Sequence, residues 1–231
     1  MNSDIRHIQL RQQINKTDIL ARIEDVNGNI VENAQKVNVQ NICNRLDKNW
    51  SRWTTILTRM DGSVYFKRSW SEYKAGFGNP PFGEFFIGME KLHPLTTTKA
   101  VVELLIILRT WDGEERCAIY DGFEIGNETE KYRIKFLGKY DGNAGDQMRT
   151  HIGYNFSTYD EDNDAYDEGN CAKAWRGAWW FNACYESHLF GPYMQEVNAS
   201  TRGVSWNNPD WKGSYYSFEY AAMLLRPKIN N

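Results

Sequence analysis

The sequence predicts an α+β fold with a mainly antiparallel central sheet, short helices and a long loop-rich region. Residues 98–111 are rich in Val, Ile and Leu, which is typical of a buried strand. An Asp-Gly pair follows and is a strong tight-turn signal, so we expect residues 115–125 to form the antiparallel hairpin partner. Residues 138–213 hold many Gly, Asp, Asn and Trp without periodicity. A loop region of this length in a compact domain is usually functional.

A short helix and two further strands complete the predicted domain. Ser69 and Glu72 have the spacing of a capping box, with Ser69 as the N-cap. Aromatic residues on one helical face follow: Trp70, Tyr73 and Phe77. Gly76 is expected to end the helix. Residues 132–137 alternate between apolar and polar side chains, which predicts a half-buried strand, and residues 214–225 form a closing strand.

Residues 1–40 differ from the rest of the chain, because they contain no aromatic residue and are rich in Asn, Gln and charge. Four apolar residues form an a/d pattern: Ile19, Ile23, Val26 and Ile30. The pattern is short and an Asn-Gly pair interrupts it, so two interpretations stay open. The segment is a loose helical tail, or it is the end of a coiled coil that assembles a homo-oligomer. We predict a polar segment over residues 1–40 and one domain over residues 41–231.

Charge and hydropathy exclude two classes of protein. Lys plus Arg is 27 and Asp plus Glu is 30, so the net charge is −3, which argues against a nucleic-acid partner. A membrane span needs about 20 apolar residues, whereas Glu103 interrupts the longest apolar stretch, residues 101–108. Residues 1–30 contain no apolar core of a signal peptide. The chain is therefore either cytosolic or written in a mature or truncated form.

Cysteines and glycosylation motifs favour the secreted alternative. Cys171 and Cys184 lie thirteen residues apart, and a disulfide there would stabilise the fold by roughly 3 kcal/mol. A metal pair is disfavoured because no second Cys or His stands at metal-ligand spacing. Cys43 and Cys117 either pair with each other or stay free. Five N-x-S/T triplets favour secretion and a glycoprotein, at Asn15, Asn49, Asn127, Asn155 and Asn198.

No catalytic constellation is recognisable around the four His residues. The sequence contains no H-E-x-x-H, no G-x-S-x-G and no Gly-rich phosphate loop. A carboxylate pair for glycoside hydrolysis stays open because Asp and Glu are plentiful, but nothing singles one out. We therefore expect a protein that is not an enzyme, and we name no catalytic residue.

The acidic run over residues 160–164 is the most informative stretch for a cofactor. Ca²⁺ takes six to eight oxygen ligands, which alternate carboxylates on an irregular loop can supply together with carbonyls and water. The run is not an EF-hand, because position 6 is Ala165 instead of Gly and position 12 is Cys171 instead of Glu. Two interpretations stay open from the run itself: a Ca²⁺ loop and a solvated acidic loop.

Residues 61–78 resemble the fibrinogen C-terminal (fibrinogen-related) domain family. Their sequence is DGSVYFKRSWSEYKAGFG, and the family pattern is D-G-S-x-x-F-x-R-x-W-x-x-Y-x-x-G-F-G. The likeness continues in GEFFIG at 83–88, AGD at 144–146, FST at 156–158, GNCA at 169–172, GAWW at 177–180 and RP at 226–227. It covers residues 42–228. The resemblance implies the fibrinogen C-terminal α+β fold and an extracellular, non-enzymatic recognition protein, like ficolins, tachylectins, angiopoietins and invertebrate immune lectins. A coiled coil often precedes this domain, which favours the coiled-coil interpretation.

The resemblance also implies that the acidic run is a Ca²⁺ site. The implied ligands are two side chains followed by two backbone carbonyls: Asp162, Asp164, Tyr166 and Glu168. The loop has one residue more than the commonest family spacing, so the second carbonyl stays open among three neighbours: Asp167, Glu168 and Gly169. Asp160 would support the loop from behind the ligands. The family's disulfide at this place matches Cys171–Cys184.

The family's ligand pocket lies beside this loop and often contains a cis peptide before the second Cys, here Ala183-Cys184. The residues that the resemblance assigns to the pocket are Trp175, Ala183, Cys184, Tyr185 and Ser200. Tyr185 and Ser200 stand where the acetyl-binding lectins have His and Tyr. These two differences count against acetyl-group binding and leave the ion site and the general pocket in place.

The beginning of the domain departs from the family pattern. Cys43 matches the Cys that starts the family's first core strand, but its usual upstream partner is absent. Residues 47–52 replace a Gly-rich stretch. Cys117 is the one candidate partner for Cys43.

From these observations we expect a secreted, non-catalytic recognition domain for innate immune recognition. A Ca²⁺-ordered, disulfide-closed loop would present a pocket for a carbohydrate, an acetylated group or a peptide terminus. The alternative is a receptor ligand or adhesion module of the angiopoietin or fibrinogen kind, which binds a cell-surface receptor through a protein surface.

Overall fold

The computed structural model of the protein describes residues 52–195, 203–213 and 216–228. Several predictions fall outside these residues and stay predictions. They are the segment 1–40 with its coiled coil and homo-oligomer, the boundary at residue 41, the pairing of Cys43 with Cys117, and the pocket position of Ser200.

A seven-stranded antiparallel sheet forms the centre of the domain, with strand order β2-β3-β1-β11-β4-β5-β8. Its strands are β1 (Thr54–Arg59), β2 (Phe77–Gly78), β3 (Phe85–Phe86), β4 (Val102–Arg109), β5 (Glu115–Tyr120), β8 (Tyr140–Gly142) and β11 (Tyr220–Pro227). The predicted α+β class with a mainly antiparallel sheet and short helices is therefore confirmed.

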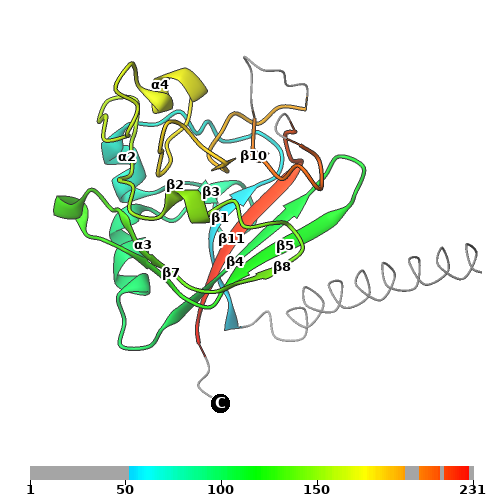
Figure 1. Ribbon diagram of the computed structural model, residues 1–231, viewed down its shortest axis with the longest axis horizontal. Helices are drawn as coiled ribbons and strands as arrows, with labels where there is room; N and C mark the ends of the chain where they lie inside the picture. The colour runs from blue at the N-terminus through cyan, green and yellow to red at the C-terminus, as the bar shows by residue number, and fades with distance from the viewer. Residues whose placement is uncertain (1–51, 196–202, 214–215, 229–231) are drawn as a thin grey trace, which may run out of the picture. The chain divides into compact units, whose positions relative to one another are not determined.

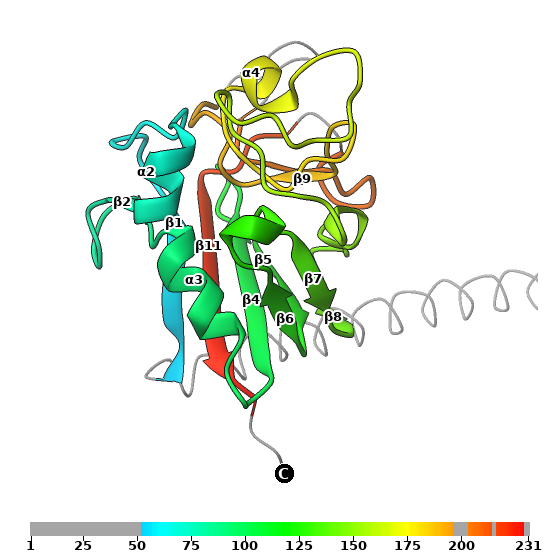
Figure 2. The same cartoon turned by 90° about the vertical axis from the view of Figure 1, so that its left-hand side faces the viewer.

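Within the described residues, two small sheets and five short helices surround the central sheet. The small sheets pair β6 (Phe123–Ile125) with β7 (Ile134–Leu137), and β9 (Ser187–His188) with β10 (Ser205–Trp206). The helices are α2 (Trp70–Ala75), α3 (Met89–Thr96), α4 (Cys171–Trp175) and the 3₁₀ helices η2 (Glu128–Glu130) and η3 (Arg149–His151). In Figures 1 and 2 the loop-rich region that carries α4 gathers at one end of the central sheet. No helix among the described residues is long and apolar enough to cross a membrane.

The closing strand of the sequence lies in the middle of the sheet. β11 pairs with β1 on one side and along its full length with β4 on the other, and Ala222 faces Ile107 in the second pair. The strand begins at Tyr220, later than predicted, and β4 is shorter than the predicted residues 98–111. Because β11 lies between β1 and β4, it forms main-chain hydrogen bonds with a strand on each side and joins the two parts of the sheet.

The predicted hairpin partner over residues 115–125 is wrong as one strand. The chain leaves the central sheet at Asp121 and Gly122, so β5 stays in the large sheet while β6 pairs with β7. Asp121 accepts the main-chain N–H of Lys139, and a Cβ on Gly138 would lie only 2.5 Å from the nitrogen of Gly122. This close approach of two backbones turns the chain into the second sheet.

The predicted half-buried strand over residues 132–137 is confirmed in part as β7. The predicted alternation of buried and exposed side chains fails at Lys135 and Phe136, which are both exposed. Glu124 pairs with Phe136 and Ile125 pairs with Ile134, so Lys135 is an extra residue in the ladder. A bulge of this kind turns two successive side chains toward the same side.

The helix predicted after Ser69 is confirmed with its capping box. The N–H of Glu72 donates to the Ser69 hydroxyl at 3.4 Å, and the N–H of Ser69 donates to the Glu72 carboxylate at 2.9 Å. Gly76 ends the helix with a φ of 90°, a conformation that favours glycine. Tyr73 is fully buried and its ring packs 5.2 Å from that of Phe156. Helix α2 thus presents its aromatic face to the loop-rich region.

Helix α3 was not predicted from the sequence. Pro94 lies inside it and no side chain caps its first turn at Gly88. Both features remove the local signals by which a helix is recognised. Met89 and Leu92 are fully buried, so tertiary packing stabilises this helix.

Candidate functional site

The acidic loop is anchored at its base to the core. Ser157 and Trp179 exchange two main-chain hydrogen bonds, of 2.9 and 3.2 Å. The side chain of Asn163 donates to the carbonyl of Phe156 at 3.0 Å, and its main-chain N–H donates to the Ser157 hydroxyl at 2.8 Å. The loop therefore folds back on its own beginning and exposes the acidic residues between these anchors.

Asp160 connects the loop to helix α2. Its carboxylate accepts the main-chain N–H of Trp70 at 3.0 Å and the hydroxyl of Thr158 at 2.8 Å. A carboxylate at the first turn of a helix is favourable because it accepts an otherwise unpaired N–H. Asp160 thus holds the loop in position, and its carboxylate is directed to the helix.

Asp162 and Asp164 form a close carboxylate pair. Asp164 is half-buried and accepts the main-chain N–H groups of Tyr166 at 2.9 Å and Cys171 at 2.8 Å. Burial raises the pKa of the Asp164 carboxyl, and the neighbouring Asp162 adds to the shift, whereas the two N–H donors act against it. Among the described residues no Lys, Arg or His forms an ion pair with either carboxylate.

The following residues supply further oxygen atoms. The carbonyl of Tyr166 accepts the N–H of Gly169 at 3.2 Å and keeps a second lone pair. Glu168 is exposed, and its carboxylate accepts the Tyr166 hydroxyl at 3.4 Å. In the described part of the chain no three acidic, His or Cys side chains converge on one point. The donor set fits a hard cation only if carbonyls and water complete it, as Ca²⁺ allows.

The disulfide and the cis peptide close the other side of the site. Cys171 and Cys184 are bonded with a Cα–Cα distance of 5.7 Å, and the Ala183-Cys184 peptide is cis. Both features are confirmed as predicted. The N–H of Ala165 donates to the carbonyl of Asn182 at 3.3 Å, so the acidic loop touches the segment that contains the cis peptide.

An aromatic cluster lies next to the cis peptide. The rings of Trp175, at the end of α4, and Tyr185 meet edge to face at 5.6 Å. Tyr185 also lies 5.0 Å from His188 and 6.1 Å from Phe181. The structure therefore brings together four of the predicted pocket residues: Trp175, Ala183, Cys184 and Tyr185.

Three members of this cluster were not predicted from the sequence. They are Phe181, His188 and Asn207, whose side-chain amide donates to the carbonyl of Tyr185 at 3.3 Å. Burial lowers the pKa of His188 to about 3, and the nearby Arg59 guanidinium adds to this shift. His188 is therefore neutral at physiological pH. Asn207 could only be found from the pairing of β9 with β10, which joins distant residues.

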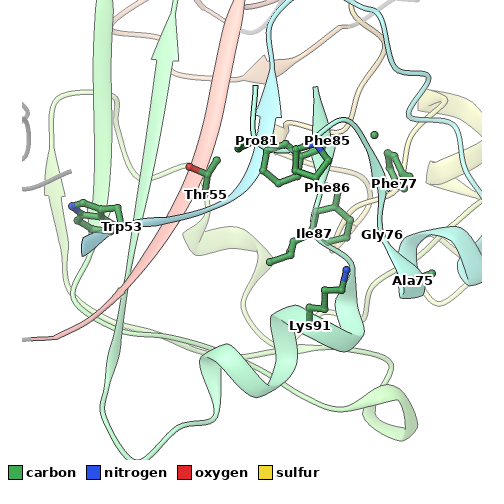
Figure 3. Close-up of a pocket in the computed structure, with 12 residues that line it drawn as sticks. Trp53, Thr55, Ala75, Gly76, Phe77, Pro81, Phe85, Phe86, Ile87 and Lys91 are labelled. Carbon is green, nitrogen blue, oxygen red and sulfur yellow. The ribbon is translucent and has the colours of Figure 1, made fainter. Parts of the chain in front are cut away.

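A separate cavity of about 520 Å³ lies at the β2–β3 edge of the sheet. Figure 3 shows Phe77, Phe85 and Phe86 from the strands together with Lys91 from α3. None of the residues that line it belongs to the acidic loop or to the aromatic cluster.

The family of fibrinogen beta and gamma chains, C-terminal globular domain, matches residues 12–228. The chain belongs to this family. This fibrinogen C-terminal domain is 44% identical over 178 residues to angiopoietin-related protein 6 of Homo sapiens, which covers 76% of the chain. It spans only 37% of that relative's length.

Solved structures show the same fold. The fibrinogen-like globe domain of human ANGPTL6 is 43% identical with a TM-score of 0.71, and the match covers 77% of this chain and 79% of that one. Lamprey fibrin D-dimer, complexed with the peptide ligand Gly-His-Arg-Pro-amide, is 34% identical with a TM-score of 0.69, covering 78% of this chain and 63% of that one. Since the family is made of non-enzymatic ligand-binding domains, this chain is a non-catalytic recognition domain.

Proposed function

We propose that this fibrinogen C-terminal domain is secreted, binds Ca²⁺ through its acidic loop and binds a carbohydrate or acetylated ligand at the adjacent aromatic cluster. The observation that carries the proposal is the hydrogen bond from Ala165 to Asn182. It joins the acidic loop to the segment that leads into the cis peptide. An ion that orders the loop would therefore also order the pocket.

The ion is supported by the close pair of Asp162 and Asp164. Two neighbouring carboxylates repel each other when both are charged, and no described cationic side chain forms an ion pair with them. A bound Ca²⁺ would neutralise the pair, with carbonyls of residues 166–169 and water as further oxygen ligands. Secretion is supported by the Cys171–Cys184 disulfide, since such bonds persist in oxidising compartments.

The ligand class is supported by the composition of the cluster. Trp175 and Tyr185 are partly exposed and supply aromatic surface, and the side-chain amide of Asn207 is fixed beside it by the carbonyl of Tyr185. The neutral His188 lies buried beneath them. Apolar walls with a small number of fixed polar groups are typical of small-molecule sites. Sugar rings and acetyl groups combine an apolar face with polar substituents and fit such walls.

A second function is favoured by the relatives. The human relative at 44% identity is an angiopoietin-related protein, and the lamprey structure is complexed with a short peptide. These findings favour a receptor ligand or adhesion module that recognises a protein surface or a peptide end. Tyr185, in place of the His of acetyl-binding lectins, points the same way.

Thermal unfolding in EDTA and in saturating Ca²⁺ tests the ion site. When the Ca²⁺ concentration is a hundred times Kd, a ligand that binds only the folded state adds about 2.7 kcal/mol to the free energy of unfolding. This raises the Tm by about 5–10 °C for a domain of this size. Asp164→Asn should abolish the increase. Glu161→Gln is the matched control, since it removes one loop charge outside the carboxylate pair and should keep the increase. A Tm that Ca²⁺ leaves unchanged in the unaltered protein would refute the ion site.

A glycan array run beside a panel of short peptides separates the two functions. Binding of acetylated or other sugars, lost in Tyr185→Ala and retained in the matched control Tyr154→Ala, supports the lectin function. A blank array with binding of peptides or of a receptor ectodomain supports the protein-ligand function. Because Ca²⁺ is present in both arms, this result does not depend on the outcome of the EDTA experiment.

A further inference from the structure

Two N-x-S/T triplets fall within the described residues, and the fold treats them in opposite ways. Asn127, Glu128 and Thr129 lie where β6 leads into η2, at the surface. Asn155 begins the second triplet, which runs into the core at the start of the acidic loop. An N-linked glycan is bulky and solvated, so it must stay outside the folded protein. We therefore compare Asn127 and Asn155 as attachment sites for an N-linked glycan.

Asn127 is exposed and holds its side chain in a defined orientation. Its Oδ1 accepts the main-chain N–H of Glu130 at 3.1 Å and the hydroxyl of Thr129 at 2.7 Å. The side-chain nitrogen Nδ2 donates to no described residue. The oxygen thus caps η2 while the nitrogen is directed away from these contacts, and a substituent on Nδ2 leaves the cap intact.

Helix η2, which Asn127 caps, is held against helix α2. Glu128, the next residue, accepts the indole N–H of Trp70 at 3.1 Å and the ammonium group of Lys74 at 2.7 Å. Both donors belong to α2, so η2 is attached to a capped helix. A glycan on Asn127 would therefore extend from the start of η2 into solvent without displacing a core side chain.

Asn155 has the opposite environment. It is half-buried, and its Oδ1 accepts from the Arg133 guanidinium at 3.1 Å. The next two residues, Phe156 and Ser157, are fully buried, and Ser157 pairs with Trp179. The Ser157 hydroxyl that a glycosylation motif needs is occupied by the N–H of Asn163.

We propose that Asn127 carries an N-linked glycan and that Asn155 does not. The inference rests on the secretion proposed above. In the transfer, Nδ2 of Asn127 forms a bond to the anomeric carbon of a lipid-pyrophosphate-linked oligosaccharide. The bond from that carbon to the pyrophosphate oxygen breaks, the lipid pyrophosphate leaves with the electron pair, and the amide loses one proton.

The test expresses the full chain behind a heterologous secretory leader in cultured animal cells. Entry into the secretory pathway is then independent of the chain's natural location. Site-resolved peptide mass spectrometry measures occupancy at each Asn in secreted and in cell-retained protein. We expect glycan on Asn127 in most molecules and on Asn155 in few.

Variants test whether the glycan is attached at Asn127. Asn127→Asp keeps the capping oxygen and removes Nδ2, so it should lose the mass of one glycan without a change in Tm. Thr129→Ala should lose the same glycan, and Thr129→Ser should keep it. The matched control Asn155→Asp should leave the glycan mass unchanged. An unmodified Asn127, or equal occupancy at Asn155, overturns the proposal. Neither result bears on natural secretion, which is measured separately by detecting the protein in the medium of the cells that naturally produce it.

Discussion

The guanidinium of Arg59 lies 3.4 Å from the carboxylate of Glu84, and both side chains are buried from solvent. Arg59 also donates to the carbonyls of Leu189 and Gly191 at 2.8 and 2.7 Å. Glu84 accepts main-chain N–H groups of Met60 and Val64. One buried ion pair thus connects the end of β1 and the residue before β3 to the segment after β9.

Glu84→Gln should destabilise the domain by about 3–5 kcal/mol, because it leaves the Arg59 charge buried without its partner. Glu219→Gln is the matched control. Its partner Arg109 is 40% exposed, so breaking that pair should cost less than about 1 kcal/mol. Urea unfolding measures both values, and equal losses in the two variants would contradict the role of the buried pair.

Ser69→Ala should cost about 1 kcal/mol, because the N–H of Glu72 loses its capping oxygen. For a domain of this size the loss corresponds to a Tm lower by about 2–4 °C. Ser69→Asp supplies another capping oxygen and should restore most of the Tm. A Ser69→Ala variant as stable as the unaltered protein would show that packing of α2, and not its cap, fixes the helix.

Replacing Cys171 and Cys184 together by Ala should cost about 3 kcal/mol, since the disulfide closes a thirteen-residue loop. We also expect weaker Ca²⁺ binding, because Asp164 accepts the N–H of Cys171 and would lose a fixed neighbour. Calorimetric titration with Ca²⁺ measures the second effect at a temperature where the variant is folded. Unchanged Ca²⁺ affinity would mean that the loop is ordered without the disulfide.

Stability should fall as the pH is lowered from 7 to 5. Burial lowers the pKa of His151 to about 4 and that of His188 to about 3. The unfolded chain takes up protons below its His pKa of about 6.5, whereas the folded chain does not, so each site costs about 1.4 kcal/mol per pH unit below that value. The stabilisation is complete above the unfolded pKa and declines toward the folded one.

Urea unfolding at pH 7 and pH 5, in EDTA, measures this dependence. His188→Gln removes one of the two titrating sites and should reduce the slope by about half. The substitution also lowers the free energy of unfolding at pH 7. The test therefore compares how steeply that free energy changes with pH in the two proteins, and not its value at one pH. Equal stability of the unaltered protein at the two pH values would contradict neutral buried histidines.

Local signals predicted the helix α2 correctly. Ser69 and Glu72 are three residues apart, so their capping box forms within one turn and needs no distant partner. The disulfide was likewise predictable, because it joins two Cys residues across a short segment. The cis peptide was expected only from the family pattern, which also favoured the Ca²⁺ interpretation of the acidic run over a solvated loop. Helix α3 escaped prediction because its support comes from buried packing.

Other features of the domain depend on contacts between residues far apart in the chain. The chain turns out of the central sheet at Gly122, where the backbone of Gly138 packs closely against it. Asp160 is directed to α2 by the N–H of Trp70, ninety residues earlier. Asn207 joins the aromatic cluster through the pairing of β9 with β10.

The sequence by itself determined the fold class, the family, the non-catalytic character and the position of the disulfide beside the acidic loop. These features depend on residue types at short spacings, and short spacings dictate local backbone conformation. The tertiary structure alone decided that Asp160 is directed to helix α2, which glycosylation motif lies at the surface, and how the acidic loop contacts the segment before the cis peptide. Those outcomes depend on burial and on hydrogen bonds between residues far apart in the chain, which exist only once the domain has folded.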